Sequence, residues 1–407
     1  MYNIKLTDYI PAPTPAESDR IIAAHYYAAW KKGAAGIHEG FDDLADEFPD
    51  RTPLMGYYDE ENPEVTDWEI KWALEHGINC FIYCWYRRHD NYGKPVTVDD
   101  LRCGHGLHEA LFRARYGKMM KFAIMYEASP RWGGTDESDM LAHLMPFWME
   151  NYFKRENYLV IDNKPVLFVY QQTRLGQECF KSAESQRATF DACREYAKQY
   201  GFDGMTFAVC RSEGREDVHA DLMARGYDLR FGYNSGFYAP YDHFEDEEAI
   251  IDAQCRLLER NLKIDPERFI ATPSCFADPT PRRSQRWCDL GYKFREVTRW
   301  YLTPENYRRL LERMKAMTDA LPEGAWGRRI MMIDNWNEWD EGHFVAPSHK
   351  FGFKFLQAIR EVLTKRNNLP DYVMPQDRGF GGYNTSWRTP DFAEFCEKTL
   401  HERKAEP

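Results

Sequence analysis

Short apolar runs and longer amphipathic segments alternate along the whole chain. Each short run is rich in β-branched and aromatic residues, which favour strands. Each is followed by a segment whose apolar positions recur at helical spacing. The pattern predicts eight strands, carried by residues 21–30, 79–86, 120–128, 164–171, 204–211, 229–235, 268–276 and 328–339.

The segments between these runs have the start and stop signals of helices. Several end in a glycine where a helix C-cap belongs, as at Gly77, Gly117, Gly201 and Gly226. In the third segment, Pro146 interrupts the helical pattern and predicts a kink or a division into two pieces. Helices are expected over residues 64–79, 106–117, 137–153, 182–201, 217–226, 247–262, 304–321 and 351–367.

Eight strand–helix units indicate an α/β protein whose parallel sheet closes into a single (β/α)8 TIM barrel. A unit would take about 51 of the 407 residues, which leaves room for insertions. A doubly wound sheet is the alternative, but residues 24–33 lack the glycine-rich phosphate turn that follows the first strand of such folds. We expect one catalytic domain over residues 1–407, with its core at about 20–367 and a C-terminal extension at 368–407.

The composition narrows the classes of partner. The chain has 53 Lys and Arg against 65 Asp and Glu, a formal net charge of −12, which argues against nucleic acid. No apolar run approaches 18 residues, so no membrane-spanning helix is expected, and the first residues lack the pattern of a signal peptide. The ten cysteines suit buried reduced thiols. We expect a cytoplasmic protein, with a secreted or periplasmic form whose signal was trimmed as the alternative. The oligomeric state stays open.

Polar and aromatic residues gather where the predicted strands end, which is where barrel enzymes have their active sites. The chain has 12 Trp, 25 Tyr and 25 Phe, whose flat rings can fill a core but also suit a cleft that binds a carbohydrate substrate. The predicted substrate-binding residues are Tyr26, Tyr27, Trp85, Tyr86, Glu127, Trp132, Asn234, Asp278, Arg282, Asn337 and Trp339.

Some of these residues have a structural alternative. Each tryptophan could equally fill the core. Glu127 could form an ion pair with Arg131, and Asp278 could pair with Arg282 to hold a loop.

Two carboxylates, Glu338 and Glu341, lie at the end of the last predicted strand. If the chain turns helically there, their Cβ atoms lie about 5–6 Å apart. That is near the separation of about 5–5.5 Å between the carboxyls of a retaining glycosidase. A protonated carboxyl can supply a proton to the leaving oxygen while an ionised neighbour assists attack at the anomeric carbon. We predict that Glu338 and Glu341 are the catalytic pair, with a solvated acidic loop as the alternative.

The stretch IDNWNEWDEG at 333–342 resembles the signature of glycoside hydrolase family 99 and of the related WbsX-like domain family. In both families a strand ends in Asn-Glu-Trp-x-Glu-Gly. Further stretches resemble the two families in the same order, and the resemblance spans about residues 20–365. These stretches are HYYAAW at 25–30, EHGINCFIYCWY at 75–86, YEASPRWGG at 126–134 and SCFADPTPRR at 274–283.

The resemblance implies a (β/α)8 barrel that acts on glycans without a metal or an organic cofactor. It also implies a retaining endo-α-mannosidase mechanism through a 1,2-anhydro sugar. Glu338 would act as the base on the sugar 2-hydroxyl, and Glu341 as the general acid and then the base. The chain departs from the family pattern at Asp340, where family 99 tends to carry His, and at Ala346, where related chains carry Glu. These departures bear on the mannose specificity.

Two other functions remain open. A glycosyltransferase of polysaccharide biosynthesis would need basic residues or an Asp-x-Asp motif for a nucleotide diphosphate, and no such motif follows a predicted strand. An inactive glycan-binding barrel is the other alternative, because Ala346 replaces a carboxylate. Cys103, His105 and His108 resemble metal ligands, but their spacing matches no standard zinc pattern, so we expect no metal.

Overall fold

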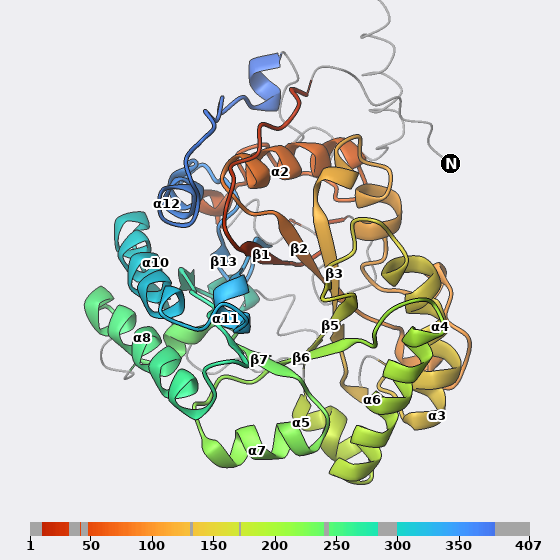
Figure 1. Ribbon diagram of the computed structural model, residues 1–407. Coiled ribbons are helices and arrows are strands. Elements are labelled where there is room, and N and C mark those ends of the chain that lie inside the picture. The colour runs from red at the N-terminus through yellow and green to blue at the C-terminus, as the bar shows by residue number, and fades with distance from the viewer. Residues whose placement is uncertain are drawn as a thin grey trace, which may run out of the picture.

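Eight parallel strands form a ring at the centre of the protein, with helices around it (Figure 1). The computed structural model describes residues 10–31, 41, 48–130, 133–170, 172–239, 244–283 and 299–378, without the side chains of 282 and 283. The strands of the ring are β1 (Ile21–Tyr26), β2 (Cys80–Trp85), β3 (Lys121–Glu127), β5 (Lys164–Tyr170), β6 (Thr206–Cys210), β7 (Leu229–Phe231), β8 (Phe269–Ile270) and β11 (Ile330–Ile333).

The strand order confirms the predicted (β/α)8 barrel. Each strand pairs in parallel with the next along the chain, and β11 pairs with β1. The last gap is closed by two parallel bridges, Ala271 to Met331 and Ser274 to Asp334. All eight predicted runs therefore supply a strand, although the eighth ends at Ile333 instead of continuing to residue 339.

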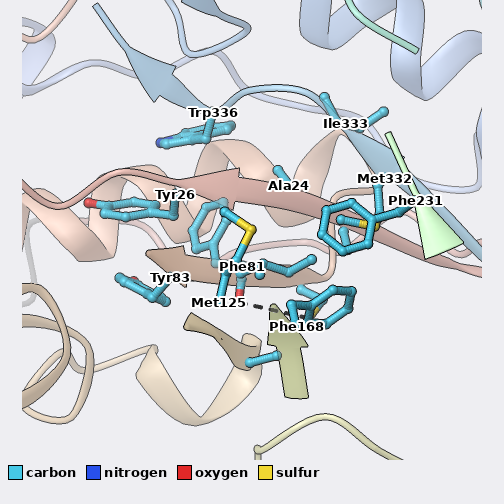
Figure 2. Close-up of a cluster of buried hydrophobic side chains, with 14 of the residues drawn as sticks. Ala24, Tyr26, Phe81, Tyr83, Met125, Phe168, Phe231, Met332, Ile333 and Trp336 are labelled. Carbon is cyan, nitrogen blue, oxygen red and sulfur yellow. Dashed lines mark hydrogen bonds between the residues drawn. The ribbon is translucent and has the colours of Figure 1, made fainter. Parts of the chain in front are cut away.

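The barrel strands are buried on both faces, and alternate side chains point to the interior and to the helices. His25 of β1 lies 5.7 Å (ring centroids) from Phe231 of β7, so both rings face the interior, as does Phe168 at 5.5 Å from Phe231 (Figure 2). Tyr26 and Tyr83 pack together, with ring centroids 4.4 Å apart, on the opposite face of β1 and β2, toward the helices (Figure 2).

Most helices of the outer layer begin close to the expected residues, and several have a side-chain cap at the N-terminus. The side chains of Asn62, Ser182, Asp246 and Thr303 each accept a backbone N–H from the first turn of the helix that follows. The four capped helices are α2 (Pro63–Glu75), α6 (Ala183–Lys198), α8 (Glu247–Ile264) and α10 (Pro304–Asp319). The outer layer also contains α7 (Glu216–Ala224) and α12 (Lys354–Leu363).

Two predicted helices are irregular. Residues 137–153 stay helical throughout, but wide π-type turns over 140–144 and 149–153 flank α4 (Met145–Trp148), which contains Pro146. The interruption expected at this proline is thus a change of hydrogen-bond pattern, because proline has no N–H to donate. Residues 106–111 form a π-type turn instead of a regular α-helix.

A short hairpin follows the eighth strand and replaces its predicted end. β12 (Asn337–Glu338) pairs antiparallel with β13 (His343–Phe344). Further along the chain, residues 371–373 lie against α2, where Val373 accepts a hydrogen bond from Trp72 Nε1 at 3.1 Å. None of the described helices is long and apolar enough to cross a membrane.

A buried ion pair joins the loop after β2 to the segment after β3. The Arg87 guanidinium is fully buried and bonds both oxygens of Asp139, at 3.1 and 2.6 Å, and also the carbonyl of Gly134 at 2.7 Å. We expect Asp139→Ala to lower the free energy of unfolding by about 3–5 kcal/mol, because it leaves a buried charge without its partner. Urea denaturation measures this loss.

The double variant Arg87→Met, Asp139→Leu is the matched control. It removes both charges and keeps the volume apolar, so it should recover most of the lost stability. A single variant as stable as the wild type would contradict a stabilising role for this pair.

Candidate functional site

Three carboxylates converge at the carboxyl end of the barrel. Glu127 ends β3 and faces the interior, while Glu338 and Glu341 come from the hairpin after β11. Burial raises the pKa of the Tyr233 phenol, and the neighbouring Glu341 and Glu338 carboxylates raise it further. The pKa of Tyr170 is likewise raised by burial and by neighbours that include Glu341 and Glu127. The Tyr233 and Tyr170 phenols therefore lie close to carboxylates from β3 and from the hairpin, so the three acids surround one space.

The two hairpin glutamates have different backbone settings. Glu338 lies in β12, and Glu341 lies in the turn that joins β12 to β13, where Gly342 N–H donates to the Trp339 carbonyl at 3.2 Å. The chain does not turn helically here, so the separation expected from a helical turn does not apply. Gly342 has a φ of +53°, and a Cβ on it would lie 2.8 Å from the Asp278 carbonyl oxygen, so glycine is required.

The Glu341 side chain is held from across the barrel. Tyr233, two residues after β7, donates its hydroxyl to Glu341 Oε2 at 3.1 Å. The Glu341 carbonyl accepts the Asp278 N–H at 2.7 Å. Tyr233 was not among the predicted site residues, although its position just after a predicted strand could have indicated it.

Asn337 fixes the hairpin to the first strand. Its amide oxygen accepts the Tyr27 N–H at 2.8 Å, and its amide nitrogen donates to the Tyr27 carbonyl at 3.0 Å and to Glu60 Oε1 at 2.7 Å. Asn337 is fully buried and its amide is occupied by these partners. The predicted substrate-binding residue therefore orients the backbone beside Glu338 instead of facing a ligand.

Trp339 and Asp278 also hold the hairpin in place. Trp339 is buried against Phe344, with ring centroids 4.3 Å apart, and donates from Nε1 to Tyr58 at 2.9 Å. Arg51 donates to the Trp339 carbonyl at 3.1 Å and pairs with Asp278 at 2.8 Å. Burial acts to raise the pKa of Asp278, but hydrogen bonds and Arg51 outweigh it and hold the pKa below its usual value. Asp278 therefore helps to hold the loop, which was the structural alternative considered for it, and its ion-pair partner is Arg51.

Because side chains alternate along a strand, some of the remaining predicted residues face the helices and others face the barrel interior. Tyr26 donates to Glu69 of α2 at 2.6 Å, and Trp85 donates to Tyr152 at 3.0 Å, so both side chains face the helices. Each is at most 2% exposed, so neither ring can stack on a sugar at the barrel mouth, and both predictions are wrong. Tyr27 and Tyr86 face the interior, with ring centroids 6.4 Å apart.

Burial dominates the acid–base properties of the interior face. Burial raises the pKa of Tyr86, with Glu338 among its charged neighbours. Glu127 accepts the Ser129 N–H at 2.9 Å, yet burial raises its pKa to about 7.

Asn234 lies near the interior with a left-handed backbone, φ +50°, and donates its N–H to Asp334. Its side-chain oxygen is buried without a hydrogen bond to any described residue. Trp132 lies outside the described residues, as does the side chain of Arg282.

Two buried acids behind the hairpin had no signal in the sequence. Glu69 accepts hydrogen bonds from Tyr26 and, at 3.0 Å, from Trp336 Nε1, and burial raises its pKa to about 7. Glu60 accepts the Trp30 N–H at 2.9 Å, and burial, reinforced by Glu69, raises its pKa well above the usual value. These carboxyls are satisfied by donors on β1 and around the hairpin.

A second buried cluster lies under the hairpin. Asp334 is fully buried, with His25 Nδ1 at 3.1 Å and His343 Nε2 at 3.2 Å from its two oxygens. Ser274 also donates to it at 2.7 Å. Burial acts to raise the pKa of Asp334, but the two histidines outweigh it and hold it well below its usual range.

The Cys103, His105 and His108 cluster does not form a metal site. His108 Nε2 lies 3.0 Å from the Tyr152 hydroxyl, and burial lowers the pKa of His105 to about 3. Among the described residues, no group of three or more His, Cys, Asp or Glu is arranged to hold a metal ion.

The structure thus combines a (β/α)8 barrel with a glutamate pair on a hairpin after the last strand of the barrel. Residues 134–359 match the family model described as Glycosyltransferase WbsX, which is more than half of the chain, and the chain belongs to this family. The resemblance noted from the sequence is thereby confirmed.

Curated relatives carry no assigned activity. The uncharacterized protein WxcX of Xanthomonas campestris pv. campestris is 22% identical over 340 residues, covering 76% of this chain and 43% of that protein. WxcX of strain B100 is 22% identical over 341 residues with the same coverage. The chain thus spans less than half the length of the curated relatives it matches.

Solved structures share the fold. The GH99 endo-alpha-mannosidase from Bacteroides thetaiotaomicron is 16% identical with a TM-score of 0.55, covering 85% of this chain and 96% of that one. A structure named glycoside hydrolase-like protein is 15% identical with a TM-score of 0.56, covering 88% and 98%. At these identities the likeness establishes the barrel architecture.

The raised pKa of Glu69 predicts a pH-dependent stability. The folded state binds the Glu69 proton more tightly than the unfolded state does, so this contribution is fully present below about pH 4.5 and is lost as pH rises through about 7. Glu69→Gln should reduce the fall in unfolding free energy between pH 5 and 7, by at most about 1.4 kcal/mol per pH unit.

Urea denaturation at pH 5, 6, 7 and 8 measures this slope. Glu259→Gln, on the exposed side of α8, is the control and should leave the slope unchanged. A Glu69→Gln slope identical to that of the wild type would show that Glu69 is not held protonated by the fold.

Proposed function

We propose that the protein is a glycoside hydrolase that cleaves glycosidic bonds in an oligo- or polysaccharide with retention of configuration. The observation that carries the proposal is the hairpin, which directs Glu338 and Glu341 to the barrel interior and holds Glu341 through Tyr233. A pair of carboxylates at one glycosidic bond can divide the acid and base roles that the reaction needs.

In the proposed mechanism, Glu341 gives its proton to the leaving oxygen and afterwards takes a proton from the attacking water. Glu338 takes the proton of the sugar 2-hydroxyl, whose oxygen then closes on the anomeric carbon to give a 1,2-anhydro sugar. When water opens this ring at the anomeric carbon, Glu338 returns the proton to the 2-oxygen. This division follows the resemblance to family 99. The hydroxyl of Tyr233 favours one rotamer of Glu341, which keeps the acid aimed at the bond being broken.

Glycosyl transfer from a nucleotide sugar is the second candidate, because the family model has that name. A nucleotide diphosphate needs cations or a metal. Among the described residues, Arg51 beside the hairpin is paired with Asp278, and Arg174, a charged neighbour of Glu127, lies 3.5 Å from Glu178. On the rim, Arg211 bonds Glu213. This distribution of charge supports hydrolysis over transfer from a nucleotide.

The first test is sugar release from a panel of oligosaccharides and bacterial polysaccharides that includes α-mannosides. Glu338→Gln keeps the side-chain size and removes the charge, and we expect it to abolish the release seen with the wild type. Glu259→Gln on α8 is the control and should match the wild type. No release by the wild type, with a thermal shift on nucleotide sugars, would replace hydrolysis by transfer. A thermal shift on glycans alone would indicate an inactive binding barrel.

A second prediction separates the two carboxylates. We expect Glu341→Gln to lose far more activity on substrates with poor leaving groups than on activated aryl glycosides, because only the former need a proton at the leaving oxygen. Steady-state kcat/KM on a series of aryl glycosides measures the difference. Equal loss across the series would contradict the acid role of Glu341.

A further inference from the structure

His343, in the second strand of the proposed catalytic hairpin, lies beside Asp334, and both side chains are fully buried. His343 is the residue of β13 that lies opposite Glu338 of β12. Opposite residues of an antiparallel pair project to the same face, with Cβ atoms about 4.5–5.5 Å apart. The imidazole therefore lies on the Glu338 side of the hairpin. Sequence reasoning assigned no role to His343 or Asp334.

The imidazole is held from both sides. His343 Nε2 lies 3.2 Å from Asp334 Oδ2, and the Tyr233 ring packs edge-on against it, with centroids 5.3 Å apart. Tyr233 is the residue that donates to Glu341, so one ring contacts the histidine and its hydroxyl contacts the acid. His343 is fully buried and neither ring nitrogen makes a hydrogen bond to a described residue, so the contact of Nε2 with Asp334 is an ion-pair contact.

We infer that His343, ion-paired with Asp334, is a positioning residue that places a positive charge beside Glu338 and Glu341. The inference rests on the proposed function for its effect on catalysis. The charge favours the ionised form of both carboxylates, so it moves the working pH range of the pair downward. Glu341 must act as a base in the second half of the proposed reaction, and the charge assists that step.

The surroundings favour a charged imidazole. Burial acts to lower the pKa of His343, but Asp334 and Glu341 outweigh it and raise the pKa above its usual value. The hydrogen bonds from Ser274 and from the Asn234 backbone favour the ionised form of Asp334. The groups that face this pair are His25 from β1, Cys210 from β6, Tyr233 after β7, Cys275 after β8, Tyr307 from α10, and Glu338 and Glu341 from the hairpin.

The pH profile of kcat/KM tests the charge. With His343→Gln, we expect both limbs of the profile to move to higher pH by about one unit, because the carboxylates lose a neighbouring cation. Asp334→Asn should move the limbs in the same direction, since the imidazole loses the partner that keeps it charged. A variant that only loosened the fold would lower the rate at every pH and leave the limbs in place, which would overturn the inference.

His25→Gln is the matched control. His25 contacts the other oxygen of Asp334 from β1, whereas His343 lies opposite Glu338 in the hairpin, so loss of His25 should leave the limbs in place. Limbs that move equally in all three variants would assign the effect to Asp334 and not to His343.

A second measurement does not depend on activity. In the full chain labelled with 15N-histidine, the signal that disappears in His343→Gln should still show an imidazolium at pH 7, above the usual pKa of about 6.5. A neutral imidazole at pH 7 would overturn the inference. An imidazolium in a wild type that releases no sugar would leave the charged pair in place and refute the proposed hydrolase function instead.

Discussion

The amide of Asn337 is the link on which the candidate site depends. It joins the end of the first strand to the start of the hairpin through two hydrogen bonds to the Tyr27 backbone, and it bonds the buried Glu60 as well. In a fully buried position, each of these groups would be costly to leave unpaired. The relative position of β1 and the hairpin is therefore fixed, and with it the position of Glu338, the next residue along the chain.

The strands of the barrel are continuous apolar runs. This made the barrel predictable from the sequence, but it also hid which side chains face the interior. Parallel strands buried on both sides give continuous apolar runs, so all eight could be found from hydrophobicity alone. A run without polar alternation does not show which residues point inward. Tyr26 and Tyr27 are chemically alike, as are Trp85 and Tyr86, yet only Tyr27 and Tyr86 face the interior.

The supporting residues of the site could not be read from local pattern. Glu69 looks like an ordinary solvated position of an amphipathic helix, but its donors, Tyr26 and Trp336, are 43 and 267 residues away in the chain. Asp334 and His343 are close to the recognised motif, but their pairing depends on a hairpin that sequence patterns placed within a longer strand. The motif therefore located the glutamate pair, while long-range contacts determine what surrounds it.

The name of the family and the proposed chemistry are compatible on one physical ground. In a retaining mechanism the first step leaves an activated sugar, and the second step is attack by whichever hydroxyl reaches it. Water gives hydrolysis, and a second sugar gives transfer, while the two carboxylates do the same work in both cases. What separates the outcomes is access to the space between Glu127 and the hairpin. Transfer by this route requires no nucleotide site, so the pairing of Arg51 and Arg211 with carboxylates argues against a nucleotide donor without arguing against a sugar acceptor.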